Sequence, residues 1–251
     1  MYRTSNPALG EGAIKRMMAH TGVGARTMTI GGTATKSMVL LLVALVSAGF
    51  VWSEYFGGNV AAAQGAAMVG AIGGLVFALV TIFAPRFAPW TAPLYAVMEG
   101  MLLGGVSAMF ESLPGFEGIT LQAVGLTLGT LLTLLLAYRS GLIRATENFR
   151  LGITAATGGI MVYYLISFVG GFFGFQMPLI HDTGWMGIGF SLFVVVIAAL
   201  NYVLDFDFIE RAAEAGADKR MEWYGAFSLL VTTVWLYLEL LRLLAKLRSD
   251  D

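Results

Sequence analysis

The feature that most constrains this chain is a series of seven long apolar segments separated by short connections. A helix that crosses the roughly 30 Å of bilayer hydrocarbon needs about 20 mostly apolar residues. The segments lack the alternating pattern of about 10 residues that is typical of strands in a membrane β-barrel. The sequence therefore predicts an all-α, polytopic membrane protein with seven transmembrane helices. They are placed near residues 37–56, 60–84, 90–110, 119–138, 151–174, 184–205 and 223–244.

The composition agrees with a protein embedded in a lipid bilayer. Only 12% of the 251 residues are charged and 57% are hydrophobic, which leaves too little polar surface to coat a soluble globule. A net charge of −1 gives no reason to expect a nucleic-acid partner. We expect residues 1–36 to form a cytoplasmic N-terminal tail and residues 37–251 to form a single seven-helix transmembrane domain, because no linker interrupts them.

The positions of the basic residues predict the orientation of the chain. With the N-terminus in the cytoplasm, twelve of the 15 Lys and Arg residues lie on the inner side, and the outer loops between spans carry none. This distribution satisfies the positive-inside rule. Three basic residues near the C-terminus oppose it, because seven crossings leave them outside. Either the twelve inner charges decide the orientation despite these three, which we favour, or the last segment is re-entrant and returns to the cytoplasm.

Glycine pairs spaced four residues apart predict where the helices pack. Lipid provides no hydrophobic drive for helix association, so small residues must allow close contact. One such pair occurs in each of four consecutive segments, and together they indicate a tight bundle without a wide lumen. The pairs are Gly70 and Gly74, Gly100 and Gly104, Gly125 and Gly129, and Gly170 and Gly174.

Acidic residues inside apolar segments are the candidate functional groups, because a charge at mid-membrane costs about 2.5–3.5 kcal/mol. Glu99 is the deepest of them, since it lies nine residues after Trp90, or about 13 Å along a helix. Two interpretations remain open for Glu99. Its carboxyl group either serves only the packing of neighbouring helices or lies on an ion or proton path, and we favour the path.

Asp205 and Asp207 follow residues 184–200, a run of 17 residues without an ionisable group. We expect the helix to continue past both aspartates and to end with Gly216 as its C′ residue. Residues two apart do not share a helix face, so only one aspartate is expected to point into the bundle. Asp205 is the better candidate for an ion path or pH sensor. Asp207 is a further candidate for that role, although we favour its interpretation as an interfacial charge.

Two further acids lie in the last segment. Glu222 opens it, where a carboxylate interacts favourably with the helix N-terminus. Glu239 precedes Arg242 by three residues and can pair with it on one helix face. We favour structural roles for both acids, with an outer-mouth role for Glu239 as the alternative.

The chain shows no signature of an enzyme. It contains no G-x-S-x-G, H-E-x-x-H or G-x-G-D motif, and it has no cysteine. Its two histidines, His20 and His181, lie in the predicted tail and in an outer loop. We therefore expect no catalytic residues and no cofactor.

Four stretches resemble a known membrane family. LDFDFIERAAEAG and the following WYGAFSLLVTTVWLYLELLRLLAKL are similar to the sixth and seventh helices of the Bax inhibitor-1 family, also called the transmembrane Bax-inhibitor-motif family. TMTIGGTATKSMVLLLVAL and LYAVMEGMLLGGVSAMFE resemble its bacterial branch. The resemblance runs from about Thr27 to Arg248. It implies seven helices with the C-terminal one central in the bundle, and a location in the bacterial cytoplasmic (inner) membrane.

The resemblance also implies site residues. The family's sixth helix ends in a tyrosine- or phenylalanine-Asp-Thr-Gln motif, and counting back from Gly216 places Asp205 on its aspartate. A partner aspartate of the seventh helix should fall near Leu229 to Thr232, where this chain has no acid. The groups left as candidate partners of Asp205 are Asp207, Glu99, Glu222 and basic residues such as Arg86.

Well-studied members of the family are implicated in pH-sensitive calcium leak, and eukaryotic ones in suppressing cell death. The leading hypothesis is therefore a pH-sensitive leak channel or transporter for cations, calcium above all, with Asp205 as the inner gate and Glu99 deeper on the path. Carboxylate oxygens suit hard divalent cations, so these two residues are also the candidate calcium ligands. The alternative is a non-transporting adaptor that modulates membrane-protein quality control or other membrane complexes, with membrane proteins as its partners. The candidate salt-bridge or gate residues are Arg86, Glu222, Glu239 and Arg242.

Overall fold

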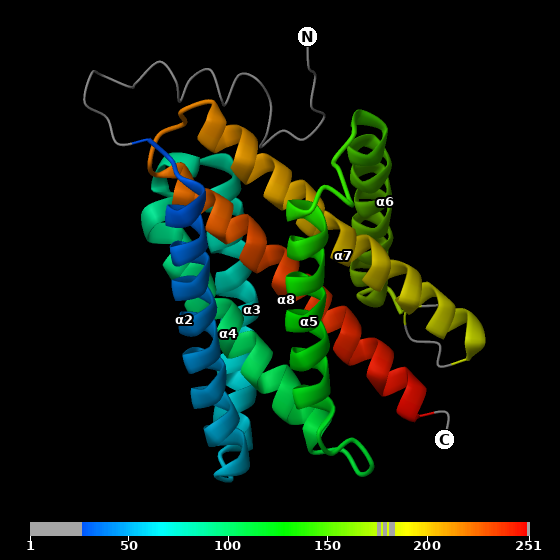
Figure 1. Cartoon of the computed structure of the whole chain (residues 1–251). Helices are drawn as coiled ribbons and strands as arrows, with labels where there is room; N and C mark the ends of the chain where they lie inside the picture. Colours follow the sequence, from blue (N-terminus) through cyan, green and yellow to red (C-terminus); the bar gives the residue numbers. More distant parts are fainter. Residues whose placement is uncertain (1–26, 175–176, 178–179, 181–183, 250–251) are drawn as a thin grey trace. The chain divides into compact units, whose positions relative to one another are not determined.

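A computed structural model of the chain describes residues 27–174, 177, 180 and 184–249 (Figure 1). This part contains seven helices that are long and apolar enough to cross a membrane, which confirms the predicted all-α fold class. A 3₁₀ turn, η1 (Pro85–Phe87), precedes the third of them. The seven are α2 (Ile30–Phe56), α3 (Val60–Phe83), α4 (Ala88–Glu111), α5 (Ile119–Arg139), α6 (Glu147–Gly171), α7 (Trp185–Glu214) and α8 (Met221–Arg248). Residues 1–26 of the predicted tail lie outside the described residues.

The ends of two helices show how local sequence sets their length. α2 begins at Ile30, earlier than the predicted residue 37, because Thr29 caps it by accepting a hydrogen bond from the amide of Gly32. α7 continues past both aspartates to Glu214, as predicted. Gly216 follows it with a φ of 66°, a left-handed conformation that favours glycine, which confirms the expected C′ residue.

The chain folds as two compact units, described separately below. The first comprises residues 1–109 and 207–231, and the second comprises residues 110–206 and 232–251. α7 and α8 contribute residues to both units. In α8, 61% of the most apolar window is buried, more than in any other spanning helix of the described residues, which confirms the C-terminal helix as the central one. The assignment of residues 37–251 to a single domain stays a prediction.

In the first unit, glycines bring the backbones of α2, α3 and α4 into contact. A Cβ atom added at Gly100 would lie 2.3 Å from the carbonyl oxygen of Ala44 in α2. One added at Gly70 of α3 would lie 2.4 Å from the carbonyl oxygen of Met98. Real side-chain atoms do not approach backbone so closely, so these glycines are packing contacts, as predicted. Figure 1 shows the three helices side by side.

The glycine pairs of the second unit do not have this role. Among the described residues, no atom lies within 4 Å of a Cβ added at Gly125 or Gly129 of α5, so none of these residues packs closely on them. Gly174 lies beyond the end of α6 and has a φ of 74°, so it forms part of the turn that follows the helix. The predicted contacts at these positions are therefore wrong. Glycine spacing predicts a flat helix face, but it does not determine which helix packs on that face.

Candidate functional site

Asp205 lies on α7 in the second unit and is only 9% exposed. The hydroxyl of Thr232 on α8 donates a hydrogen bond of 2.6 Å to Oδ2 of Asp205. One turn earlier on α7, the hydroxyl of Tyr202 donates to the Thr233 hydroxyl over 3.0 Å. We call these four residues the α7–α8 seam. It joins the two helices through adjacent buried hydrogen bonds, one of which involves an ionisable group.

Thr232 stands within the short range where the family resemblance implies an aspartate. A hydroxyl can donate to an ionised carboxylate, and it can also accept from a protonated one. The hydrogen bond between Thr232 and Asp205 is thus compatible with both protonation states. Sequence reasoning missed this residue because it looked for an ionisable partner, although the position itself was a sufficient signal. The four partners suggested for Asp205 all belong to the first unit, so those pairings stay predictions.

Asp207 belongs to the first unit and is as buried as Asp205, with 9% exposure. Its carboxylate pairs with Arg211 one turn later, with 2.5 Å between Nη2 and Oδ2. The expectation that only one aspartate points inward is wrong, because every residue from Asp205 to Ile209 is buried.

Glu99 lies on α4 in the first unit, where the hydroxyl of Tyr95 donates a hydrogen bond to its carboxyl group one turn away. A Cβ atom added at Gly74 of α3 would lie 2.9 Å from Glu99 Oε1, so the glycine leaves room for this carboxyl between the helices. Its Oε2 atom is buried without a hydrogen-bond partner among the described residues. The four-residue spacing of Tyr95 and Glu99 is the sequence signal that could have identified the pair.

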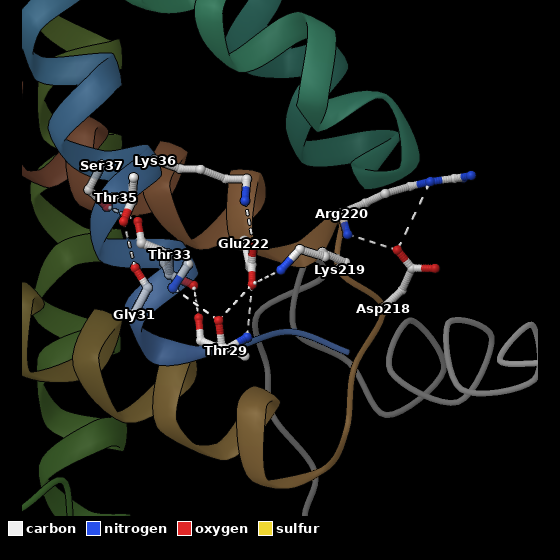
Figure 2. Close-up of polar contacts among 11 residues, drawn as sticks. Thr29, Gly31, Thr33, Thr35, Lys36, Ser37, Asp218, Lys219, Arg220 and Glu222 are labelled. Atoms are coloured by element: carbon white, nitrogen blue, oxygen red, sulfur yellow. Dashed lines mark hydrogen bonds and ion pairs between the residues drawn. The ribbon is translucent and has the colours of Figure 1, made fainter. Parts of the chain in front are cut away.

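Glu222 is fully buried in the first unit, and four donors surround its carboxylate. The amide and the hydroxyl of Thr29 donate to Oε1 over 3.0 and 2.9 Å, and Nζ of Lys219 does so over 2.9 Å. Nζ of Lys36 contacts Oε2. Figure 2 shows the three side chains reaching the carboxylate from different directions. We call Glu222, Thr29, Lys36 and Lys219 the Glu222 clasp.

The clasp adds contacts that were not expected for Glu222. The residue does lie in the first turn of α8, but its carboxylate accepts hydrogen bonds from the residue that caps α2. Thr29 and Lys36 were not expected to take part, because both were assigned to the tail. A lysine near the start of one apolar run and a glutamate at the start of another were the available signal.

Glu239 forms the predicted pair with Arg242 in the second unit. Nη1 of Arg242 lies 2.8 and 2.9 Å from the two carboxylate oxygens of the buried Glu239. The hydroxyl of Tyr164 on α6 donates to Oε1 over 2.9 Å, and it also accepts a hydrogen bond from Arg242. Tyr164 could not be foreseen from spacing, because it lies on another helix. The three side chains tie α6 to α8.

Removing the cation of this cluster should destabilise the protein. We expect Arg242→Met to lower the free energy of unfolding by about 3 kcal/mol, because it leaves the Glu239 carboxylate buried without its counter-charge. Tyr164→Phe removes only one hydrogen-bonding group and should cost about 1 kcal/mol. Thermal and denaturant unfolding of both variants in detergent micelles measures the difference. Equal losses would show that the charge of Arg242 contributes nothing beyond a hydrogen bond.

The remaining candidates are Arg86 and the predicted calcium ligands. Arg86 lies in η1, is exposed, and places its guanidinium 4.8 Å from the centre of the Phe87 ring. In the described part of the chain, no group of three or more Asp, Glu or His side chains is arranged to hold a metal ion. Asp205 and Glu99 belong to different units, so calcium binding by the two together stays a prediction.

Comparison with known proteins places the chain in a family context. A family model described as Bax inhibitor 1 like matches residues 6–249. Searches of curated proteins and of solved structures found no match. The matched range includes all seven helices, and therefore every candidate residue described above.

Proposed function

The chain belongs to the Bax inhibitor 1 like family, and on this premise we propose that it provides a pH-sensitive leak pathway for cations, calcium above all, across its membrane. The observation that carries the proposal is the α7–α8 seam. It contains Asp205, a buried carboxyl group that accepts a hydrogen bond from a hydroxyl on α8, the most buried of the spanning helices in the described residues. A carboxyl group in this position places a charge that can be removed by protonation at the contact between two membrane helices.

The proposed mechanism is competition between protons and cations for Asp205. The ionised carboxylate of Asp205, which accepts a hydrogen bond from Thr232, attracts a hard cation, because such cations prefer carboxylate oxygens as ligands. Protonation removes the charge and with it the attraction for the cation. The flux should therefore follow the protonation of Asp205.

Glu99 is proposed as a second carboxylate on the path. Its buried Oε2 atom has no hydrogen-bond partner among the described residues, so it retains free capacity for a cation or a proton. The space left by Gly74 beside the carboxyl supports this assignment, because a larger residue there would collide with it. Glu222, Glu239 and Arg242 are proposed to hold the helices around the path.

Calcium flux into liposomes tests the proposal. The full chain is reconstituted, and calcium entry is followed with an enclosed dye over a series of buffered pH values. We expect the wild-type flux to change with pH and the Asp205→Asn flux to lose most of that change, because asparagine has no proton to exchange there. Asp218→Asn makes the same replacement in the loop before α8 and should behave like wild type.

Two outcomes would contradict the proposal. Identical pH profiles for wild type and Asp205→Asn would remove Asp205 from the mechanism. Liposomes that stay tight to cations at every pH would favour the alternative, a non-transporting adaptor of membrane complexes. Recovery of a stable membrane-protein partner on gentle detergent purification would then identify what it modulates.

A further inference from the structure

The Glu222 clasp attaches the first turn of α2 to the first turn of α8 through one buried carboxylate. The side chain of Glu222 is 0% exposed, and its carboxylate accepts hydrogen bonds from the amide and the hydroxyl of Thr29. Thr29 and Glu222 are 193 positions apart in the sequence. Lys36 comes from the second turn of α2, and Lys219 comes from the loop before α8. The Glu222 clasp therefore includes groups from both helices (Figure 2).

Gly32 allows the carboxylate to approach the start of α2. A Cβ atom added at this glycine would lie 2.2 Å from Glu222 Oε1, so any side chain would displace the carboxylate. The Gly32 amide donates to the hydroxyl of Thr29, and this hydroxyl in turn donates to Glu222. A negative charge beside these amides also interacts favourably with the positive end of the α2 dipole. The clasp thus depends on the backbone of α2 as well as on its side chains.

Apolar contacts accompany the clasp. Thr33 of α2 faces Gly225 of α8, where an added Cβ would lie 3.1 Å from Thr33 Cγ2, so the helices meet here through small residues. The amide of Met28 donates to the carbonyl oxygen of Ala217 over 2.7 Å, and Met28 packs in a buried cluster with Phe208, Ile209 and Tyr224. Between Thr33 and Gly225 the small residues bury little apolar area, so hydrogen bonds and charge add to the attachment of this turn.

The two lysines differ in their surroundings. The side chain of Lys219 is 41% exposed, so water screens its ion pair with Glu222 and reaches this edge of the clasp. The side chain of Lys36 is only 18% exposed, and its ammonium group also lies 5.5 Å from the centre of the Trp223 ring. Lys36 is therefore the principal counter-charge of Glu222.

We infer that the Glu222 clasp is a releasable latch between α2 and α8. While Glu222 holds Lys36 and Thr29, the first turn of α2 stays on α8 and keeps Thr33 buried. Loss of the ion pair between Glu222 and Lys36 lets water replace the hydrogen bonds of the clasp. The first turn of α2 then separates from α8. The inference is independent of the proposed ion path, because it concerns the attachment of a helix start.

Cysteine labelling tests the latch directly, because the chain contains no cysteine of its own. Thr33 is 1% exposed, and Thr33→Cys introduces a side chain of similar size at this buried position. Gly31 is exposed, and no atom of the described residues lies within 4 Å of an added Cβ, so Gly31→Cys serves as the accessible reference on the same turn. The full chain in lipid nanodiscs is treated with a water-soluble maleimide. We expect slow labelling at position 33 and fast labelling at position 31.

Variants of the clasp should then open it. Glu222→Gln keeps an oxygen for Thr29 but removes the charge, and Lys36→Met keeps the apolar stem but removes the ammonium group. We expect each to accelerate labelling at position 33 by about tenfold or more, as local opening exposes the buried site. Lys219→Met should have a smaller effect, because its ion pair is partly screened by water. Glu239→Gln changes an equally buried glutamate of the same helix and should leave the labelling unchanged.

Two results would overturn the inference. One is labelling at position 33 that is equally slow in the unaltered clasp, in Glu222→Gln and in Lys36→Met. The other is labelling at position 33 that is as fast as at position 31 when the clasp is unaltered. If Glu222→Gln fails to accumulate, Lys36→Met decides alone, because it leaves Glu222 bonded to Thr29 and Lys219.

Discussion

Gly104→Ala is expected to lower the free energy of unfolding by about 3 kcal/mol, the cost of overpacking at a contact that cannot relax. The Cβ atom of the new alanine would lie 2.3 Å from the carbonyl oxygen of Ala48 and 2.9 Å from its Cα atom. These are backbone atoms of α2, so the collision cannot be relieved by turning a side chain. α2 and α4 would have to move apart, which loosens the first unit.

Gly125→Ala provides the matched control for this change. An added Cβ at Gly125 meets no atom within 4 Å, so the substitution introduces no collision. Alanine favours a helix over glycine by about 1 kcal/mol, so this variant should be as stable as wild type or slightly more so. Thermal unfolding of both variants in the same detergent, followed by tryptophan fluorescence, compares them. Similar transition temperatures for the two would contradict the close contact between α2 and α4.

Thr232→Asp is expected to raise the pH of half-maximal calcium entry by more than about one unit. The substitution places a second carboxyl group beside Asp205, whose Oδ2 atom lies 2.6 Å from the hydroxyl of Thr232. Two carboxylates this close cannot both ionise readily, so the pair keeps one proton up to a higher pH. The change from the protonated to the ionised state, and the flux that follows it, therefore moves upward.

Thr232→Asn separates charge from size in this experiment. Asparagine has nearly the shape of aspartate but no ionisable group, so the variant should keep the wild-type pH midpoint even if its total flux differs. The liposome assay with enclosed dye measures both variants. Equal midpoints for Thr232→Asp and Thr232→Asn would mean that the α7–α8 seam does not set the pH response.

Features governed by neighbours in the sequence could be predicted well. The pair between Glu239 and Arg242 follows from three-residue spacing on one helix, and the structure confirms it. The end of α7 before Gly216 follows from the conformational freedom of glycine. The start of α2 was missed because the polar residues before the apolar run were assigned to the tail, although Thr29 is a good capping residue.

Features that depend on a second helix were predicted poorly. The glycine pairs of α4 and α5 have the same spacing, yet only Gly100 and Gly104 meet another backbone closely. Spacing shows that a face is flat, and only the fold supplies its neighbour. The same limit explains why Tyr164 was not foreseen as a partner of Glu239, since the two residues lie on different helices.

The sequence by itself determined that the chain spans a membrane as seven helices and that a small set of acids lies in or beside apolar segments. The reason is that hydropathy, segment length and charge position are properties of the chain read in order. Only the tertiary structure decided which groups satisfy those acids: Thr232 for Asp205, and Thr29 with Lys36 for Glu222. A buried carboxylate needs hydrogen-bond donors, but they can come from any helix that packs against it, and local spacing does not specify which.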